Sequence, residues 1–397
     1  MKILTILLLL ITTSVFSQTE FQKDFNEFWT DIRDNHAYLE IQGIDWEKVK
    51  EIYQPMVRTI KNRDEFIMFL ETIINELHNG HISLNTNLNT SNRIIPSGSD
   101  IFVQKNGNAY FITDIRKNHP AELCGLKPGL EVIKFDGGNV DSLLTHFLPK
   151  YTKVYNDEIY EYALNMMFAG THDKKRVITV LEDGHEKNYF PDEFKMSNQS
   201  SNLIEFNIIE NNIGYIKIKN SLFDNGLISE FDDAIDSLRH TSKLILDLTE
   251  TPSGGNSAVA RAIMGRFIEN EMPYQKHEAF ETSYKIRRSW VEYVSPRKSI
   301  YSKDVFIMVG HWTGSMGEGI AIGFDAIGKA KIIGTKMARL LGAIEGFKLP
   351  KTDIGFQIPT ERLYHIKGKP REDFRPQYLE NNIYDTWKKV NELIHIN

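Results

Sequence analysis

Two segments of the sequence place small residues directly after an apolar, strand-like run, where a backbone amide or a hydroxyl group can do chemistry. The first continues from KLILDL into a loop with Gly254 and Gly255, and a helical pattern begins near Ser257. Glycines let the backbone approach a ligand closely, and amides at a helix N-terminus face a developing negative charge. The segment is therefore a candidate oxyanion hole, although a flexible loop with Asn256 or Ser257 as an ordinary N-cap explains it equally well.

The second segment, DVFIMVGHWTGSMGEGIAIGF, ends its strand-like run near Val309 and begins a helical pattern after Ser315. The turn between them would place the Ser315 hydroxyl and the Met316 amide at the positive end of a helix. An acyl-transfer nucleophile would sit at such a turn. Thr313 replaces the first glycine of a GxSxG elbow, which disfavours a simple α/β-hydrolase. Taken alone, a serine in this position is more often an N-cap than a nucleophile.

A serine nucleophile needs a base, and the segment ELHNGHISL offers two histidines. His81 follows a glycine turn and precedes a short strand-like run, and His78 lies three residues earlier. A neutral imidazole can accept a serine proton near neutral pH. A lone histidine is more often an ordinary hydrogen-bonded residue, so its identification depends on the surrounding elements.

The elements that must position these residues fall into three parts. Residues 18–91 carry apolar side chains at helical spacing, as in FIMFLETIINEL, and predict a helical segment that contributes to the core. Residues 92–195 hold strand-like runs separated by glycine and proline, which predict a small β-rich domain. In residues 196–397 strands and helices alternate, which predicts a layered α/β core with partly parallel strands.

The first 17 residues have the pattern of a signal peptide. Lys2 precedes the apolar run ILTILLLLI, and the small residue Ser17 precedes Gln18, where we expect cleavage. The run is too short to span a bilayer. We therefore expect a secreted or periplasmic protein without an integral membrane span after cleavage. A membrane anchor and a buried helix are the alternatives.

Composition excludes several classes of function. Lysines and arginines are scattered and the formal net charge is -6, so nothing indicates a nucleic-acid partner. Cys124 is the only cysteine, so neither an intrachain disulfide nor a thiolate cluster is available. The histidines form no HExxH helix. The sequence therefore predicts a protein that needs no metal and no cofactor.

These motifs occur in the order found in C-terminal processing (tail-specific) peptidases and in the core of tricorn protease. DLTETPSGGN resembles the family's strand ending in a double glycine, SMGE at 315–318 resembles its nucleophile segment, and KIIGTK resembles a later strand, glycine and basic segment. ITDIRKNHPAELCGLKPGLEVIKFDGGNV resembles part of a PDZ domain. The resemblance covers about residues 75–377.

The resemblance implies a crotonase-like (ClpP/crotonase-type) layered α/β catalytic core at 196–397 and an inserted PDZ-like domain at 92–195. It implies a serine endopeptidase that cleaves extended or C-terminally presented polypeptides, with Ser315 as nucleophile. The amides of Met316 and of Gly254 or Gly255 would hold the oxyanion. A peptide or protein substrate is the implied partner, and a homo-oligomer stays open.

The family divides by its catalytic base. In the lysine-using branch, the base position corresponds to Leu340 here, which cannot accept a proton, and Lys336 and Arg339 lie off that register. The tricorn-like branch uses a histidine, and His81 matches it. We therefore predict a histidine base.

The tricorn-like branch also carries a late glutamate that fixes the catalytic geometry. In KGKPREDFRPQ the best match is Glu372, and Asp373 is the alternative. The segment departs from the common family form, being shorter before its proline and ending in Gln377. A solvated loop carboxylate explains Glu372 about as well.

Two other classes of function remain. The same fold can serve as a peptide- or ligand-binding protein without activity, and a serine-reactive probe would separate that class from an enzyme. A related acyl-thioester enzyme is disfavoured by the export signal, because coenzyme A is an intracellular cofactor. Tight binding of an acyl-CoA would revive that alternative.

Overall fold

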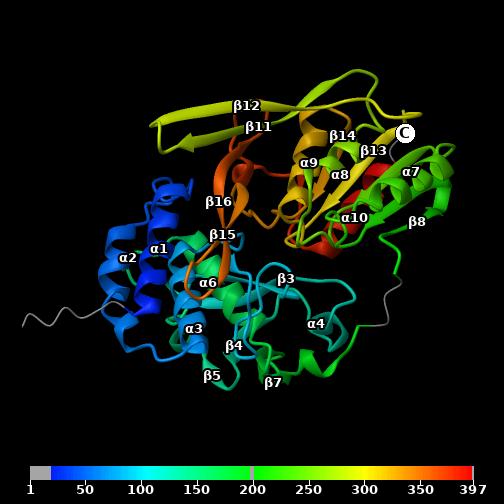
Figure 1. Ribbon diagram of the computed structural model, residues 1–397. Coiled ribbons are helices and arrows are strands. Elements are labelled where there is room, and N and C mark those ends of the chain that lie inside the picture. The colour runs from blue at the N-terminus through cyan, green and yellow to red at the C-terminus, as the bar shows by residue number, and fades with distance from the viewer. Residues whose placement is uncertain (1–18, 197–200, 396–397) are drawn as a thin grey trace, which may run out of the picture.

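The computed structural model describes residues 19–196 and 201–395, so the predicted signal peptide lies outside the described residues. Helices and strands alternate through the chain, which gives a mixed α/β fold built around three sheets (Figure 1). Within the described ranges, no helix is both long and apolar enough to cross a membrane.

The N-terminal part is helical, as the periodicity of its sequence predicts. It consists of α1 (Glu20–Asn35), α2 (Trp46–Tyr53) and α3 (Arg63–Ile74). Thr19 and Gln22 form a capping box that begins α1. The apolar faces of these helices pack against residues of a β-hairpin from the end of the chain, among them Leu349, Phe356 and Ile358. The helical part is therefore held by residues almost three hundred positions away.

An inserted domain follows, with its own antiparallel sheet in the order β2-β3-β4-β6-β7. The strands are β2 (Ile101–Asn106), β3 (Ala109–Ile115), β4 (Glu131–Phe135), β6 (Ile178–Glu182) and β7 (His185–Tyr189), and short β5 (Gly138–Asn139) pairs with β4. Its helices are α4 (Pro120–Leu123), α5 (Val140–Leu144) and α6 (Asp157–Ala169). The longest, α6, lies along the edge strand β2. The strand-like runs seen in the sequence of this part are confirmed.

The C-terminal half, the catalytic half of the sequence prediction, contains a six-stranded core sheet in the order β17-β14-β13-β10-β9-β8, parallel except for β8. The strands are β8 (Ile204–Ile209), β9 (Ile213–Ile218), β10 (Lys243–Asp247), β13 (Asp304–Val309), β14 (Ala330–Gly334) and β17 (Tyr378–Leu379). One face is covered by α7 (Leu227–Leu238), α8 (Ser257–Met264) and α9 (Met316–Ala326), and the other by α10 (Ile383–Ile394). Because helices cover both faces of the sheet, the strand residues that point to either face are apolar.

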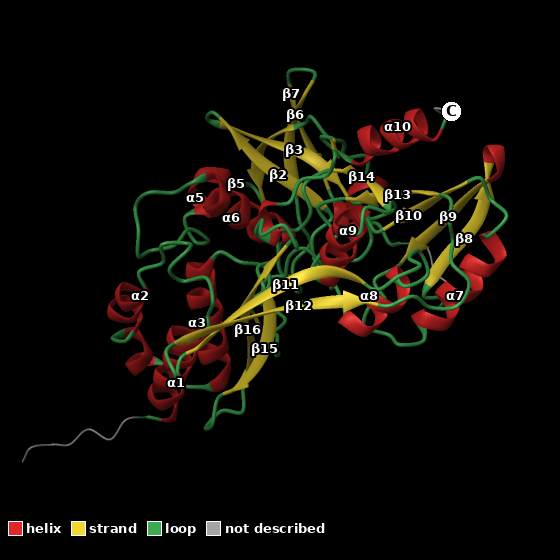
Figure 2. Ribbon diagram, turned by 90° about the horizontal axis from the view of Figure 1, so that it is seen from above, coloured by secondary structure: helices red, strands yellow, loops and turns green. Residues whose placement is uncertain are grey.

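A third sheet joins these parts and was not foreseen from the sequence. Its order is β1-β16-β11-β12, and β15 pairs with β16. The strands are β1 (Ser83–Leu84), β11 (Met272–Glu281), β12 (Ile286–Val294), β15 (Ala343–Lys348) and β16 (Gly355–Tyr364). Figure 2 shows this sheet lying between α1 and α8. Because β1 begins two residues after His81, its pairing with β16 fixes the position of that histidine relative to the third sheet.

The two candidate loops meet at the carboxyl edge of the core sheet. Strands β10 and β13 are parallel neighbours, with Asp247 paired to Met308 near their ends. The loops that follow them continue the pairing through a parallel bridge between Thr251 and Thr313. Parallel neighbours bring their carboxyl ends to one edge, where α/β proteins bind their ligands.

Candidate active site

The turn between β13 and α9 holds Ser315 in a strained conformation. Its φ is 50° and its ψ is -112°, values that L-residues rarely adopt. Thr313 braces the turn, because its hydroxyl donates to the Leu248 carbonyl and accepts from the Gly310 amide. Threonine in place of the elbow glycine therefore has a structural role, and the turn presents the Ser315 hydroxyl at the start of α9.

His81 lies in hydrogen-bond contact with this serine, 234 positions away in sequence. The distance from His81 Nε2 to Ser315 Oγ is 3.0 Å, and from His81 Nδ1 to the Leu341 carbonyl oxygen 2.7 Å. Because a carbonyl only accepts, Nδ1 carries the proton and Nε2 is left to accept one from the serine. Burial, and to a smaller extent the Arg371 guanidinium, lowers the pKa of His81 to about 4. The imidazole is therefore neutral at pH 7.

The backbone around His81 is fixed by side chains. Asn79 Oδ1 accepts from the His81 amide at 2.9 Å, and Gln357 of β16 donates to the His81 carbonyl at 3.2 Å. His78, the other candidate histidine, adopts a left-handed φ of 33° and turns its Nδ1 to the Glu76 carbonyl. Of the two histidines, only His81 contacts Ser315.

Glu318 ties the nucleophile turn to the segment that holds the histidine. Its Oε2 accepts from the amides of Ser315 (2.9 Å) and Leu340 (3.2 Å), and its Oε1 accepts from the amide of Arg339 (3.0 Å). The residue is 1% exposed. Burial raises the pKa of Glu318 to about 7, although Arg371 and the three amides act in the opposite direction. The S-x-x-E spacing of a capping box was the available sequence signal for it.

Arg371 closes the same network from the last part of the chain. Its Nη2 donates to the carbonyls of Leu340 and Gly342, and its Nη1 donates to the Ser315 carbonyl at 3.4 Å. It also lies 3.9 Å from the Glu318 carboxylate. No sequence pattern singled out Arg371, because it acts through backbone carbonyls brought together only by folding.

The glycine loop approaches the nucleophile closely. A Cβ on Gly254 would lie 2.4 Å from the Ser315 Cβ, and the φ of Gly254 is +65°. The Gly254 amide donates to the Thr251 carbonyl, whereas the Gly255 amide makes no backbone hydrogen bond. Met316 is the first residue of α9, where amides have no intrahelical acceptor. Among the described residues, the amides of Met316 and Gly255 therefore have no backbone acceptor, and Gly254 lies in close contact with Ser315.

The residues near the lysine-branch position do not supply a second base. The Leu340 side chain packs against Gly80 and Gly314, which precede His81 and Ser315. Lys336 lines a separate cavity of about 600 Å³ beside the inserted domain. Arg339 pairs with Glu158 instead.

The structure does not bring Glu372 to the histidine. Both ring nitrogens of His81 are already engaged, and the buried Oε2 of Glu372 has no hydrogen-bond partner. Glu372 stands in the short turn Arg371–Asp373, where successive side chains diverge. Arg371 points into the catalytic network, and Asp373 is exposed. Sequence similarity located the turn but not the direction of each side chain.

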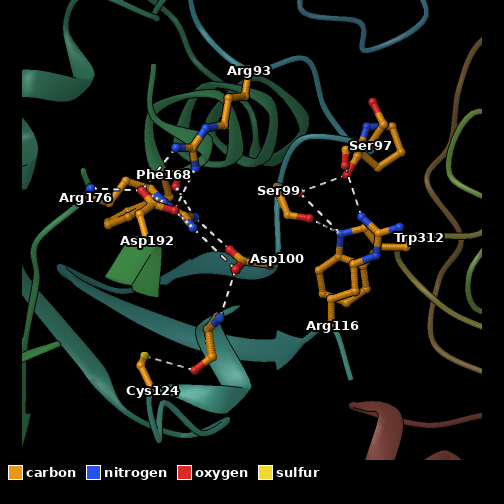
Figure 3. A network of polar contacts seen from close by, with 12 residues as sticks. Arg93, Ser97, Ser99, Asp100, Arg116, Cys124, Phe168, Arg176, Asp192 and Trp312 are labelled. Atoms are coloured by element: carbon orange, nitrogen blue, oxygen red, sulfur yellow. Dashed lines mark hydrogen bonds and ion pairs between the residues drawn. The ribbon is translucent and has the colours of Figure 1, made fainter. Parts of the chain in front are cut away.

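The inserted domain contacts both catalytic loops. Trp312, three residues before the nucleophile, donates from Nε1 to the Ser99 carbonyl at 2.8 Å (Figure 3). Arg116 donates to the Ser97 carbonyl and pairs with Glu250, four residues before Gly254. Behind this contact, Asp100 is held by Arg176 (Figure 3). The domain is thus a structural neighbour of the site.

A serine hydroxyl in hydrogen-bond contact with a neutral histidine, at the carboxyl edge of a parallel sheet, is the arrangement that serine hydrolases use. Within the described residues, no group of three or more histidine, cysteine or carboxylate side chains is arranged to hold a metal ion.

A comparison with protein families shows which kind of serine hydrolase this chain is. Residues 17–75 match the tricorn protease C1 domain, and residues 212–377 match peptidase family S41. Together the two matches cover more than half of the chain. The chain belongs to the tricorn-like S41 peptidases and is a serine peptidase.

Solved structures share the fold at low sequence identity. Mature CPAF has a TM-score of 0.64 at 14% identity, over 94% of this chain and 95% of CPAF. The photosystem II D1 C-terminal processing protease has a TM-score of 0.57 at 13% identity, over 92% and 94%. A putative peptidase from Parabacteroides merdae has a TM-score of 0.58 at 10% identity, over 95% and 96%. No curated protein matches the sequence.

Proposed function

We propose that this chain is an exported endopeptidase in which Ser315 attacks the peptide carbonyl and His81 is the base. The observation that carries the proposal is the 3.0 Å contact between His81 Nε2 and the Ser315 hydroxyl, with Nδ1 fixed by a carbonyl. Leu341 orients the imidazole where other serine peptidases use a carboxylate. A third acidic residue is therefore not required to set the tautomer.

The steps follow from this geometry. Ser315 Oγ bonds to the carbonyl carbon as its proton passes to His81 Nε2, and the amides of Met316 and Gly255 hold the oxyanion. The C–N bond then breaks, and Nε2 gives its proton to the leaving amine. Water attacks the ester, His81 takes the water's proton, and the C–O bond to Ser315 breaks as that proton returns to Oγ.

We further propose that the catalytic half is crotonase-like and the inserted domain PDZ-like. The strand–helix units that present α8 and α9 at one sheet edge support the first assignment. The edge strand β2 beside α6 supports the second, since PDZ domains add a peptide strand at such an edge. The substrate would be an extended polypeptide.

The edge of β2 is occupied at one position. Asn165 of α6 donates to the Val103 carbonyl and accepts from the Val103 amide. A peptide that adds along this edge must displace Asn165 there.

A substrate-recruiting role of the inserted domain can be tested at another of its turns. Disturbing the turn at Gly125 and Leu126 should weaken cleavage of long substrates more than hydrolysis of a small activated ester. Equal losses would count against a recruiting role.

A fluorophosphonate probe tests the chemistry directly. The wild-type protein should be labelled on Ser315 and should cleave an unstructured polypeptide, whereas folded Ser315→Ala should do neither. Absence of labelling on folded wild-type protein would refute the proposed nucleophile.

N-terminal sequencing of protein from its native cell envelope tests export, since we expect a mature chain that begins at or near Gln18. An intact Met1 there would end the export proposal.

A further inference from the structure

A wide cavity lies between the inserted domain and the core sheet, beside the loop that leads to the two glycines. Its volume is about 820 Å³. The wall is formed by the segment after β3, the end of the inserted domain, strands β8 and β9, and the loop after β10. Both halves of the protein therefore contribute side chains to it.

One residue of the wall connects the cavity to the nucleophile. Asn220 accepts from the Ser253 amide at 2.9 Å and donates to the Ser253 hydroxyl at 2.8 Å. Ser253 precedes Gly254, where a Cβ would lie 2.4 Å from the Ser315 Cβ. An extended polypeptide advances about 3.3 Å per residue. A substrate side chain a few residues from the bond at Ser315 can therefore reach this cavity.

The wall is strongly basic, although the whole chain carries a formal net charge of -6. Five lysine or arginine side chains line the cavity, against two glutamates. The basic residues are Arg116, Lys117, Lys195, Lys217 and Lys219, and the glutamates are Glu205 and Glu250. The cavity thus concentrates positive charge in an acidic protein.

The two glutamates already have basic partners. Arg116 pairs with Glu250 at 3.0 Å and donates to the Ser97 carbonyl (Figure 3), and Lys219 pairs with Glu205 at 3.3 Å. Burial acts to raise the pKa of Glu250, but the basic groups around it lower that pKa to about 2. The glutamates therefore do not compensate the other basic groups of the wall.

Three ammonium groups remain. Within residues 19–196 and 201–395, no carboxylate forms an ion pair with Lys117, Lys195 or Lys217. Lys117 lies 5.5 Å from the centre of the Trp387 ring, a contact that leaves its charge in place. Lys217 is half-buried, and the other two lysines are exposed. Positive charge of this kind, gathered in a partly enclosed cavity, attracts an anionic ligand.

The placement of these amines selects the ligand. An ammonium group donates hydrogen bonds and accepts none, so a carboxylate is its natural partner in a polypeptide. The three amines come from separate segments: the inserted domain, its last residues, and β9. A chain end offers one carboxylate, whereas a stretch with aspartate and glutamate offers several.

We propose that this cavity binds acidic side chains of the polypeptide substrate. The proposal rests on the proposed function, because it takes the ligand to be part of a chain cleaved at Ser315. The cavity would select substrates and take no part in the chemistry. Its effect should therefore fall mainly on KM.

Matched peptides test the preference. Glutamate is moved through an otherwise neutral peptide and replaced by glutamine or lysine, each peptide with a free or an amidated C-terminus. We expect glutamate to raise wild-type kcat/KM about threefold to tenfold over glutamine at one or a few neighbouring positions. The preference should shrink as salt rises from about 0.1 M to about 1 M, because the screening length falls from about 10 Å to about 3 Å. Equal kcat/KM for glutamate and glutamine at every position would overturn the proposal. A preference that appears only with a free C-terminus would assign the cavity to the chain end and would also overturn it.

Variants test whether these lysines are responsible. Lys217→Gln and Lys195→Gln should each lower the ratio of kcat/KM between the glutamate and glutamine peptides, and the double variant should bring it close to one. Lys195→Glu, a change at an exposed residue, should favour the lysine peptide instead. The matched control is Lys331→Gln, an exposed lysine of β14 outside the cavity, which should keep the ratio. An equal loss of the ratio in Lys331→Gln would assign the preference to overall charge and refute the subsite.

A binding experiment separates this proposal from the proposed function. The fluorescently labelled glutamate peptide, amidated at its C-terminus, should bind folded Ser315→Ala more tightly than its glutamine counterpart in an anisotropy titration, and the added change Lys217→Gln should remove the difference. Such a difference in binding, found when no probe labels Ser315 in wild-type protein, would keep the cavity as an acidic-peptide site and refute the mechanism. Labelling of Ser315 with equal binding of the two peptides would do the reverse.

Discussion

Two groups of buried polar side chains lie near the segment 339–342, and they differ in how completely they are paired. In the catalytic network both oxygens of Glu318 accept hydrogen bonds and both nitrogens of His81 are engaged. Among the residues that line a neighbouring cavity of about 240 Å³, Tyr38, Gln42 and Glu372 each keep a buried oxygen without a hydrogen-bond partner.

The difference separates two ways of building a site. A fully paired network holds its groups before substrate arrives, which is the preorganisation that acyl transfer requires. An unpaired cluster leaves buried oxygens without hydrogen bonds, at a cost to the stability of the protein. The comparison predicts that changes in the first cluster lower both activity and stability, whereas changes in the second have a much smaller effect on stability.

The largest effect is expected at the catalytic pair. Ser315→Ala and His81→Ala should each lower kcat/KM about a thousandfold or more, and the double variant should be little worse than either, because the two residues act as one unit. Lys336→Ala should leave kcat/KM largely intact. Full activity in folded His81→Ala, or collapse in folded Lys336→Ala, would overturn the assignment of the base.

The next effect concerns the close approach of the glycine loop. Gly254→Ala places a Cβ 2.4 Å from the Ser315 Cβ and should lower kcat/KM about a hundredfold, since small displacements of reacting groups are that costly. Gly107→Ala is the matched control, because it has a similar φ of +60° but no atom within 4 Å. It should cost about 1–2 kcal/mol of stability with activity retained. Equal loss of activity in both variants would show that backbone strain, not contact with Ser315, is responsible.

Glu318→Gln tests the paired cluster itself. The amide nitrogen of glutamine would face a backbone N–H that the carboxylate now accepts, so we expect a loss of about 1–3 kcal/mol in the free energy of unfolding. Denaturant unfolding measures this, and kcat/KM should fall as the Ser315 turn loosens. Unchanged stability and activity would show that Glu318 does not connect the two segments.

The pH dependence of kcat/KM distinguishes the two buried groups of the network. Protonated Glu318 would turn an O–H toward amides that need an acceptor, so wild-type activity should rise with pH through about 7. His81 must be neutral to act as a base, and its limb should lie near 4 rather than at the usual 6.5. A profile of kcat/KM from about pH 3 to 9 on a neutral peptide measures both limbs. The limb near 7 should be absent in Glu318→Gln, and its persistence there would assign it to another group.

The smallest effect is expected when a glutamate of the unpaired cluster, Glu372, is replaced by glutamine, as Glu318 is in the paired cluster. Burial raises the pKa of Glu372, which shows that its charged form is disfavoured in the free protein. Glu372→Gln removes that charge without breaking a described side-chain hydrogen bond, so the free energy of unfolding should change by less than about 0.5 kcal/mol. Denaturant unfolding of Glu372→Gln and Glu318→Gln compares their free energies of unfolding. Equal losses of stability in the two variants would remove the distinction between the clusters.

Much of the local structure could be predicted from the sequence. The runs at 243–247 and 304–309 form strands, and α8 and α9 begin at the expected residues, because apolar patterning and helix caps act over short distances. The third sheet was missed. Its hairpin β11–β12 is largely polar, and β12 is mostly exposed, so the hairpin lacks the clear alternation of a half-buried strand.

The sequence by itself determined which residues could do chemistry: a serine before a helix, a glycine loop, a histidine after a glycine turn, and a leucine where a lysine would be needed. Only the tertiary structure decided how they are held. His81 is oriented by the Leu341 carbonyl and Glu318 by three amides, and no described hydrogen bond joins Glu372 to the histidine. The physical reason is that backbone groups, present at every residue, supply most of these contacts, so their partners depend on which segments folding brings together.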